Sequence, residues 1–448
     1  MRKRLFLAGL AALLLAIGGS AAYFVTALDR PSGKLVGAPT DVSVVRPTVP
    51  ARPRPRPASR VPTVVVDRPC WPTFGGDPKR TLARVDLRLG RPTKPVWVRA
   101  MGSYMEYPPS YCDGRLYVNT FAGKTVALDA RTGRVIWERR GGGPKPSTPA
   151  IVGDRVIVSS KDGTVTALDR HTGRVLWQLR TEARVESSPV AVGSTVYVGA
   201  SDGRLFALDP KDGRVRWAYD TGGRINASPS VYGRRVCITT YAGGIFCLDR
   251  RSGRKLWSTY IKRDALRYES FYASPSTDGH RLYTVSRSGK VVALAADDGR
   301  VLWTHELSSW GYSTPAVAHG RVFVGDFNGY LHSYRATTGE ELWRRYVGGR
   351  LLGPAVVVGD LVFFSTLEQK TYAARVSDGR IVWRITMGKY SPGIATDRHY
   401  FFSLNGILVA FRGERSPAQA RLTTQADSGA PKAASGRRAS RPGTTSRP

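Results

Sequence analysis

Polar and apolar positions alternate along this chain in short runs that are typical of β-strands. Residues 188–219 contain four such runs, SPVAV, TVYVGA, RLFALD and RVRWAY. Turns with Asp and Gly separate several of them. Gly accepts positive φ angles and Asp hydrogen-bonds to the backbone inside a turn, so these corners reverse the chain. The pattern therefore predicts a four-stranded unit.

This unit repeats along most of the chain. The phrase LDARTGRVIW at residues 128–137 returns about every forty residues with small changes. A period near 40 with strand-like segments is the sequence signature of a β-propeller. Each repeat ends in a tryptophan that we expect to pack as an apolar plate against the neighbouring blade. These tryptophans are Trp97, Trp137, Trp177, Trp217, Trp257, Trp303, Trp343 and Trp383.

Eight tryptophans require eight blades, but only seven complete units fit between Tyr107 and Trp383. Three strand-like runs, SPGIA, HYFFSL and ILVAFR, follow Trp383. The outer strand they lack is KPVWVR, at residues 94–99. Pairing of the two chain segments removes exposed edge strands, which invite aggregation. The sequence thus predicts an all-β, eight-bladed propeller over residues 70–413, closed by an N-terminal strand.

The repeat resembles that of the pyrroloquinoline-quinone (PQQ) family of eight-bladed propellers. The stretch CWPTFGGDPKRTLA at residues 70–83 is similar to the lead-in that such proteins place before their first strand. This family contains quinoprotein dehydrogenases and also non-catalytic propellers, such as the BamB-type lipoproteins of outer-membrane barrel assembly. The resemblance therefore implies the fold and leaves two classes of function open.

The dehydrogenase class implies adjacent cysteines, calcium ligands with a catalytic Asp, and often a C-x-x-C-H haem motif. The sequence contains neither an adjacent cysteine pair nor C-x-x-C-H. Its six histidines show no paired metal-ligand spacing. We therefore expect a non-catalytic propeller of the BamB-like branch with no cofactor, metal or catalytic residue. A PQQ-dependent dehydrogenase is the alternative.

Four cysteines allow two disulfides. Cys237 and Cys247 flank a predicted hairpin and would lie opposite each other if Gly243 forms a one-residue bulge. A plain two-residue turn would instead put them on opposite faces. With the bulge, Cys70 pairs with Cys112 by elimination; without it, buried free thiols remain the alternative.

A ring of variable positions stands three residues before the proline that precedes each inner strand. Because loops from outer to inner strands emerge on one face, we expect this ring to bind a partner there. The lengthened loop at residues 258–272 enters the same face with aromatic and Arg side chains, which are enriched at binding hot spots. A merely tolerated insertion is the alternative. The predicted partner-binding residues are Glu106, Glu186, Asn226, Tyr260, Arg263, Arg267, Tyr268, Tyr272, Tyr312 and Lys389.

The N-terminal segment predicts a location outside the cytoplasm. Residues 1–4 are basic and residues 5–27 are uncharged and long enough to span a bilayer. A retained signal anchor with a cytoplasmic stub is our main interpretation. A cleaved signal peptide is the alternative, because Ser20 and Ala22 form a small-x-small pattern. A Pro/Arg-rich linker at residues 28–69 follows, and residues 414–448 read as a disordered basic tail.

Charge narrows the choice of partner. The chain of 448 residues has a formal net charge of +34, of which the two ends hold +8 and +5 and the propeller +21. Such a field attracts polyanions and anionic surfaces. A high Arg content from composition bias is the alternative explanation. The chain has no recognised nucleic-acid motif, so we expect an envelope protein or an anionic cell-wall or lipid surface instead of nucleic acid.

Overall fold

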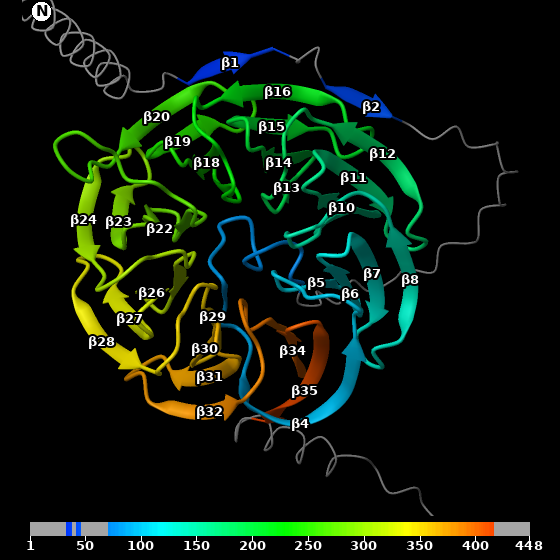
Figure 1. Cartoon of the computed structure of the whole chain (residues 1–448), viewed down its shortest axis with the longest axis vertical. Helices are drawn as coiled ribbons and strands as arrows, with labels where there is room; N and C mark the ends of the chain where they lie inside the picture. The colour runs from blue at the N-terminus through cyan, green and yellow to red at the C-terminus, as the bar shows by residue number, and fades with distance from the viewer. Residues whose placement is uncertain (1–32, 38–41, 46–69, 416–448) are drawn as a thin grey trace, which may run out of the picture.

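The computed structural model describes residues 33–37, 42–45 and 70–415. Its strands form eight sheets arranged as blades around a central axis (Figure 1). Within each blade the strands pair antiparallel from the axis outward, and in seven blades they follow one another in the chain. The predicted all-β, eight-bladed propeller is confirmed.

The seven continuous blades have these strands. The first three contain β5 (Ser110–Cys112), β6 (Arg115–Asn119), β7 (Lys124–Asp129) and β8 (Val135–Arg140); β9 (Ala150–Val152), β10 (Arg155–Ser159), β11 (Thr164–Asp169) and β12 (Val175–Arg180); and β13 (Val190–Val192), β14 (Thr195–Gly199), β15 (Arg204–Leu208) and β16 (Val215–Asp220). The next two contain β17 (Ser230–Tyr232), β18 (Arg235–Thr239), β19 (Gly244–Asp249) and β20 (Lys255–Tyr260), then β21 (Ser276–Thr277), β22 (Arg281–Val285), β23 (Lys290–Ala295) and β24 (Val301–Glu306). The last two contain β25 (Ala316–Ala318), β26 (Arg321–Gly325), β27 (Tyr330–Arg335) and β28 (Glu341–Tyr346), then β29 (Val356–Val358), β30 (Leu361–Thr366), β31 (Lys370–Arg375) and β32 (Ile381–Ile385).

The eighth blade closes the ring with strands from both ends of the propeller. It contains β33 (Ile394–Ala395), β34 (His399–Leu404), β35 (Ile407–Arg415) and the outer strand β4 (Leu89–Ala100). β4 pairs antiparallel with β35, with Val98 opposite Val409. This strand contains the predicted segment 94–99, so the predicted closure is confirmed. β35 runs two residues beyond the boundary at 413 that the sequence predicted.

At seven of the eight junctions between blades, a tryptophan of one blade covers a glycine of the next. Gly213, in the turn between β15 and β16, has a φ of +79°, and a Cβ atom there would lie 2.6 Å from the Trp177 ring of the preceding blade. The Trp177 indole N–H donates to the Pro210 carbonyl of the same turn at 2.9 Å. We call this contact the Trp–Gly latch. It recurs as Trp97–Gly133, Trp137–Gly173, Trp217–Gly253, Trp257–Gly299, Trp303–Gly339 and Trp343–Gly379.

The lead-in to the propeller fills the central axis. This axial segment, residues 70–84, lies at the centre of the ring (Figure 1) and hydrogen-bonds to the innermost part of all eight blades. Seven of its partners lie on inner strands and the eighth, Pro189, directly precedes β13. The bonds join Trp71 to Tyr111 and Ala395, Pro72 to Ile151, Thr73 to Pro189, Pro78 to Val231, Lys79 to Thr277, Thr81 to Val317, and Leu82 to Val357. At its end, β3 (Ala83–Arg84) adds a parallel strand to β29.

A buried arginine and a disulfide hold the axial segment in place. Arg80 is fully buried, and its guanidinium group donates to the carbonyl oxygens of Ser188 and Pro229 at 2.9 and 2.8 Å. Burial lowers the pKa of Arg80 to about 9. The predicted disulfide Cys70–Cys112 is confirmed and ties the segment to the first blade.

The second predicted disulfide, Cys237–Cys247, is also confirmed. The two residues are opposite each other in the pairing of β18 with β19. Gly243 in the intervening turn has a φ of +82°, which supplies the bulge on which the prediction depended.

Two pieces of the predicted linker are strands. β1 (Lys34–Val36) pairs with β16 and β2 (Ser43–Val45) pairs with β12, so each adds a fifth strand to the outside of a blade. The exposed edge of an outer strand offers free N–H and C=O groups for such pairing. The predicted membrane span at residues 5–27, the linker centre and residues 416–448 lie outside the described residues. Among those that are described, no helix has the length and apolar character needed to cross a membrane.

We predict that the Trp–Gly latch makes Gly213 more sensitive to substitution than a glycine in open space. Both Gly213 and Gly193 have positive φ angles, but a Cβ at Gly193 meets no atom within 4 Å. Both alanine substitutions carry the left-handed backbone cost, and only Gly213→Ala also overpacks a tryptophan. Overpacking costs about 1–3 kcal/mol, so Gly213→Ala should lower the free energy of unfolding by that much more than Gly193→Ala.

Denaturant unfolding of the two variants measures this difference. Equal losses of stability would show that the latch contributes nothing beyond the conformation of the turn.

Candidate functional site

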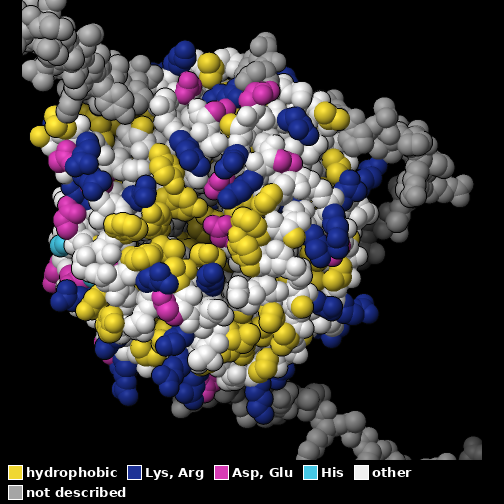
Figure 2. Space-filling view, in the orientation of Figure 1, with side chains coloured by type: hydrophobic (Ala, Val, Ile, Leu, Met, Phe, Trp, Pro, Cys, Tyr) yellow, Lys and Arg dark blue, Asp and Glu magenta, His cyan; other side chains and the backbone are white. Residues whose placement is uncertain are grey.

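The loops that join outer to inner strands meet around the axis on one face of the propeller. Figure 2 shows a hollow at the centre of this face, with hydrophobic and acidic side chains at its edge and Lys and Arg side chains around it. Five of the predicted ring residues lie at equivalent positions there, three residues before the proline that directly precedes an inner strand. They are Glu106, Glu186, Asn226, Tyr272 and Tyr312.

The predicted ring position is corrected in the last blade. Inner strand β33 matches β29 through the pairing of Ile394 with Phe401 and of Val356 with Phe363. This register puts Tyr390 at the ring position and Lys389 one residue before it. The Lys389 ammonium group lies 5.4 Å from the centre of the Tyr390 ring. The sequence alignment missed the shift because this loop is shorter than the others.

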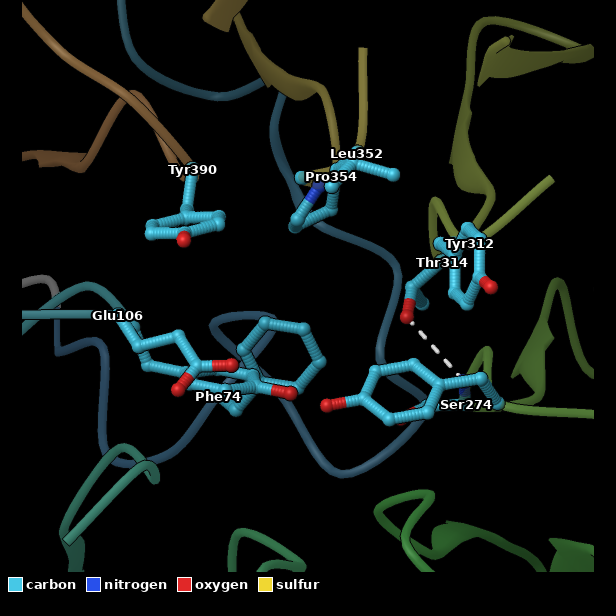
Figure 3. Close-up of a pocket in the computed structure, with 11 residues that line it drawn as sticks. Phe74, Glu106, Ser274, Tyr312, Thr314, Leu352, Pro354 and Tyr390 are labelled. Carbon is cyan, nitrogen blue, oxygen red and sulfur yellow. Dashed lines mark hydrogen bonds between the residues drawn. The ribbon is translucent and has the colours of Figure 1, made fainter. Parts of the chain in front are cut away.

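A cavity of about 230 Å³ opens in the central hollow. We call it the axial cavity, and Figure 3 shows its lining side chains surrounding an open space. Three of the predicted ring residues, Glu106, Tyr272 and Tyr312, line it. The complete lining is Phe74, Glu106, Tyr107, Tyr272, Ser274, Tyr312, Thr314, Leu352, Gly353, Pro354 and Tyr390.

A ladder of hydroxyl groups explains why the cavity lies on one side of the axis. The backbone N–H of Ser188 donates to Ser228 Oγ at 2.9 Å, that of Ser228 to Ser274 Oγ at 2.9 Å, and that of Ser274 to Thr314 Oγ1 at 3.2 Å. The next blade has Pro354 at this position, which offers neither a hydroxyl group nor an N–H group. The ladder therefore ends at Thr314, and the cavity opens where it ends.

Gly353 is needed at this break because the chain of the last blade comes close. A Cβ atom on Gly353 would lie 1.5 Å from the Tyr390 carbonyl oxygen. The close approach brings the Tyr390 ring over the cavity opposite Glu106 (Figure 3).

The carboxyl groups of Glu106, which lines the cavity, and of the ring residue Glu186, which does not, have different surroundings. Glu186 is 8% exposed, accepts a hydrogen bond from Asn226 Nδ2 at 3.2 Å and forms an ion pair with Lys161 at 3.5 Å. Glu106 is half-buried and makes neither a hydrogen bond nor an ion pair with any described residue. Burial raises the pKa of Glu106 to about 7; the charge of Lys161 lowers it and that of Glu186 raises it. Glu106 is therefore partly protonated near neutral pH.

Pairs of cationic and aromatic side chains surround the hollow. Lys161 lies 5.3 Å from the centre of the Phe121 ring, Arg224 lies 5.3 Å from that of Tyr241, and Arg350 lies 5.3 Å from that of Phe327. Such contacts hold long basic side chains in place beside rings that can contact a partner.

Trp310 is the exposed aromatic of this face, at 55% exposure, with its ring 5.7 Å from that of Phe327. Sequence reasoning missed it together with Tyr107, Tyr390 and Phe74. A signal was present, because Trp310 and Trp71 are the two of ten tryptophans that fall outside the forty-residue spacing.

The long loop at residues 258–272 separates the predicted residues into two groups. Its end is fixed by Phe271, which is fully buried, and by Glu269, which accepts a hydrogen bond from Ser288 Oγ at 2.6 Å. Tyr272 then reaches the axial cavity. The tip, with Arg263 and Arg267 exposed, lies at the outer rim beside β20 and β24 (Figure 1).

Tyr260 and Tyr268 belong to the base of that tip. Their ring centres lie 5.4 Å apart, and both side chains are half-buried. Tyr260, Arg263, Arg267 and Tyr268 thus form a rim group apart from the axis, because a loop from an outer to an inner strand spans the whole blade. Partner binding by this group stays a prediction.

A motif typical of hydrolases and a group of possible metal ligands both have structural roles in this protein. The G-x-S-x-G sequence at residues 199–203 is the turn between β14 and β15, whereas a hydrolase nucleophile needs a strand-to-helix turn. Among the described residues, Cys70, Cys112 and Asp113 lie close enough to hold a metal, but the two cysteines are bonded to each other.

Comparison with known families agrees with this architecture. A family model described as outer membrane protein assembly factor BamB matches residues 78–266, 248–389 and 327–416. The chain belongs to this family. No curated protein matches the chain in sequence.

Solved structures of several kinds are similar to this chain. BamB from Moraxella catarrhalis is 22% identical, with a TM-score of 0.49 over 67% of this chain and 82% of that chain. A europium-containing methanol dehydrogenase is 14% identical, with a TM-score of 0.63 over 74% of this chain and 87% of that one. The quinohemoprotein alcohol dehydrogenase from Comamonas testosteroni is 14% identical, with a TM-score of 0.65 over 78% and 81%. At these identities the likeness to the two dehydrogenases shows the fold alone.

Proposed function

We propose that this protein is a non-catalytic binding module of the cell envelope and that it holds its partner on the face around the axial cavity. The observation that carries this proposal is the axial cavity itself, in which five aromatic side chains and one carboxyl group converge. Aromatic and arginine side chains dominate binding energy at protein interfaces. The BamB-like propeller family supports a binding role.

A PQQ-dependent dehydrogenase is the second candidate, because two of the structural relatives are dehydrogenases. The residues of the axial cavity do not fit that cofactor. PQQ carries three carboxylates, and the charged side chain among the described lining residues is Glu106, which is itself an acid. The two described disulfides join residues 42 and 10 positions apart, not neighbours in the chain.

An envelope protein is the partner that we favour over a cell-wall polymer or a lipid surface. A cavity with buried aromatic groups selects a shaped protrusion, which a protein offers and a flat anionic surface lacks. The charge of +21 on the propeller would then mainly speed encounter with an acidic partner and make association salt-dependent.

We also propose that residues 5–27 are a retained membrane anchor and that the propeller lies on the extracytoplasmic side. The basic residues before this apolar stretch support that orientation. The full-length protein should then stay in the membrane pellet after a high-salt wash, and its intact mass should begin near Met1. A mature mass that starts at Tyr23 would contradict the anchor and leave the extracytoplasmic location in place.

The binding face is tested by removing its exposed aromatic. We expect Trp310→Ala to reduce recovery of crosslinked partners from intact cells several-fold, because a hot-spot aromatic contributes about 2 kcal/mol or more to binding. The melting temperature should hardly change, since Trp310 is 55% exposed.

Ile136→Ala is the control. Ile136 is 41% exposed and lies near the start of the outer strand β8, next to the β7–β8 turn on the opposite face of the propeller. Equal recovery with both variants would contradict the proposed face.

A further inference from the structure

We propose that the axial cavity is a socket for a cationic side chain, a lysine or arginine that the partner inserts between the aromatic rings and Glu106. This inference rests on the proposed function, because it names the chemistry by which the binding face recognises its partner.

The walls of the cavity suit a cation. Phe74, Tyr107, Tyr272, Tyr312 and Tyr390 come from different loops and from the axial segment, and they surround one space. The ring centres of Phe74 and Tyr107 are 5.2 Å apart, and those of Tyr272 and Tyr312 are 5.7 Å apart. Aromatic faces attract ammonium and guanidinium groups, and several rings around one site form a cage for them.

The ionised form of Glu106 gives the cavity a negative charge that no direct bond from a described residue offsets. Glu106 is the charged side chain among the described residues of the lining, and no described residue bonds to its carboxyl group. Lys161, the cation whose charge lowers the pKa of Glu106, is engaged with Glu186 and with the Phe121 ring. A half-buried carboxylate without a partner is unfavourable, and an inserted cation would supply that partner.

Other ligand classes fit less well. An anion would be repelled by Glu106, and a neutral apolar group would leave its carboxyl group buried and unpaired. A divalent metal needs more oxygen ligands than one carboxylate provides. The volume of about 230 Å³ is below the roughly 300–1,000 Å³ of typical small-molecule pockets, so a single side chain is the occupant that fills it.

The proton on Glu106 makes binding depend on pH. Burial raises the pKa of Glu106 to about 7. The charged and titratable groups that face it are Lys161, Glu186 and the phenols Tyr104, Tyr107 and Tyr272. A cation binds the ionised carboxylate, so affinity should rise as pH increases through about 7 and level off above it.

The test uses the full chain with n-butylammonium as a mimic of the lysine side chain. The controls are 1-butanol, which has a similar shape without charge, and butyrate. Ligand-observed NMR measures binding at pH 6 and pH 8. We expect butylammonium to bind about tenfold more tightly at pH 8 than at pH 6, because the ionised fraction of a group with a pKa near 7 changes about tenfold over that range.

Glu106→Gln removes the charge and keeps the shape. It should weaken butylammonium binding at pH 8 about tenfold and abolish the dependence on pH, with little change in melting temperature. Glu182→Gln is the matched control, because Glu182 is an exposed residue of the β12–β13 loop on the same face and outside the cavity lining. Its binding should equal that of the unmodified protein.

Three results would overturn the socket: no detectable binding of butylammonium at pH 8, equal binding of 1-butanol, or unchanged binding in the Glu106→Gln protein. If partner recovery still falls on Trp310→Ala in that case, the binding face stands and only the cationic occupant is wrong. If Trp310→Ala has no effect while butylammonium binds as expected, the socket exists and the proposed partner face fails.

Discussion

The Trp–Gly latch is the interaction on which this propeller depends. A four-stranded blade cannot bury both its faces alone, and seven of the junctions between blades are made by a tryptophan plate on a glycine turn. Glycine is required there for two reasons: the turn has a positive φ, and the indole ring occupies the space that a side chain would fill. The indole N–H adds a hydrogen bond to a carbonyl of the same turn, so the contact fixes both distance and orientation. The eighth junction has no such turn, and Trp383 packs there on Phe402 and Phe411.

The axial segment turns this repetitive ring into an asymmetric molecule. It closes the central channel and presents Phe74 as the floor of the cavity. The hydroxyl ladder joins the blades on one arc, and prolines interrupt it on the other. The axial cavity is therefore placed by the positions at which the repeat changes, while the repeat itself supplies the frame.

Much of the fold could be predicted because its determinants are local and periodic. The spacing of the tryptophans gives the blades, and one glycine bulge decides that Cys237 lies opposite Cys247. The path of the axial segment could not be predicted in this way, because its contacts are set by packing between distant parts of the chain, such as Trp71 and Ala395, 324 residues apart. The ring was predicted at Glu106, Tyr272 and Tyr312, where the repeat is regular. In the last blade the prediction named Lys389 and was one residue too early, because the shorter loop there places Tyr390 at the ring position. The sequence also could not show that the tip of the long loop lies at the outer rim and its end at the axis, because this depends on the distance that the loop crosses over the blade.

The claim that the partner sits over the axial cavity is tested most directly by photo-crosslinking in intact cells. A photoreactive amino acid would replace Arg287, an exposed residue of this face whose Nε lies 2.9 Å from the Tyr312 hydroxyl group. In a second protein it would replace Arg131, an exposed residue in the turn between β7 and β8 on the opposite face. The account predicts a discrete crosslinked partner from position 287 and none from position 131. Crosslinking from position 131 alone would contradict it.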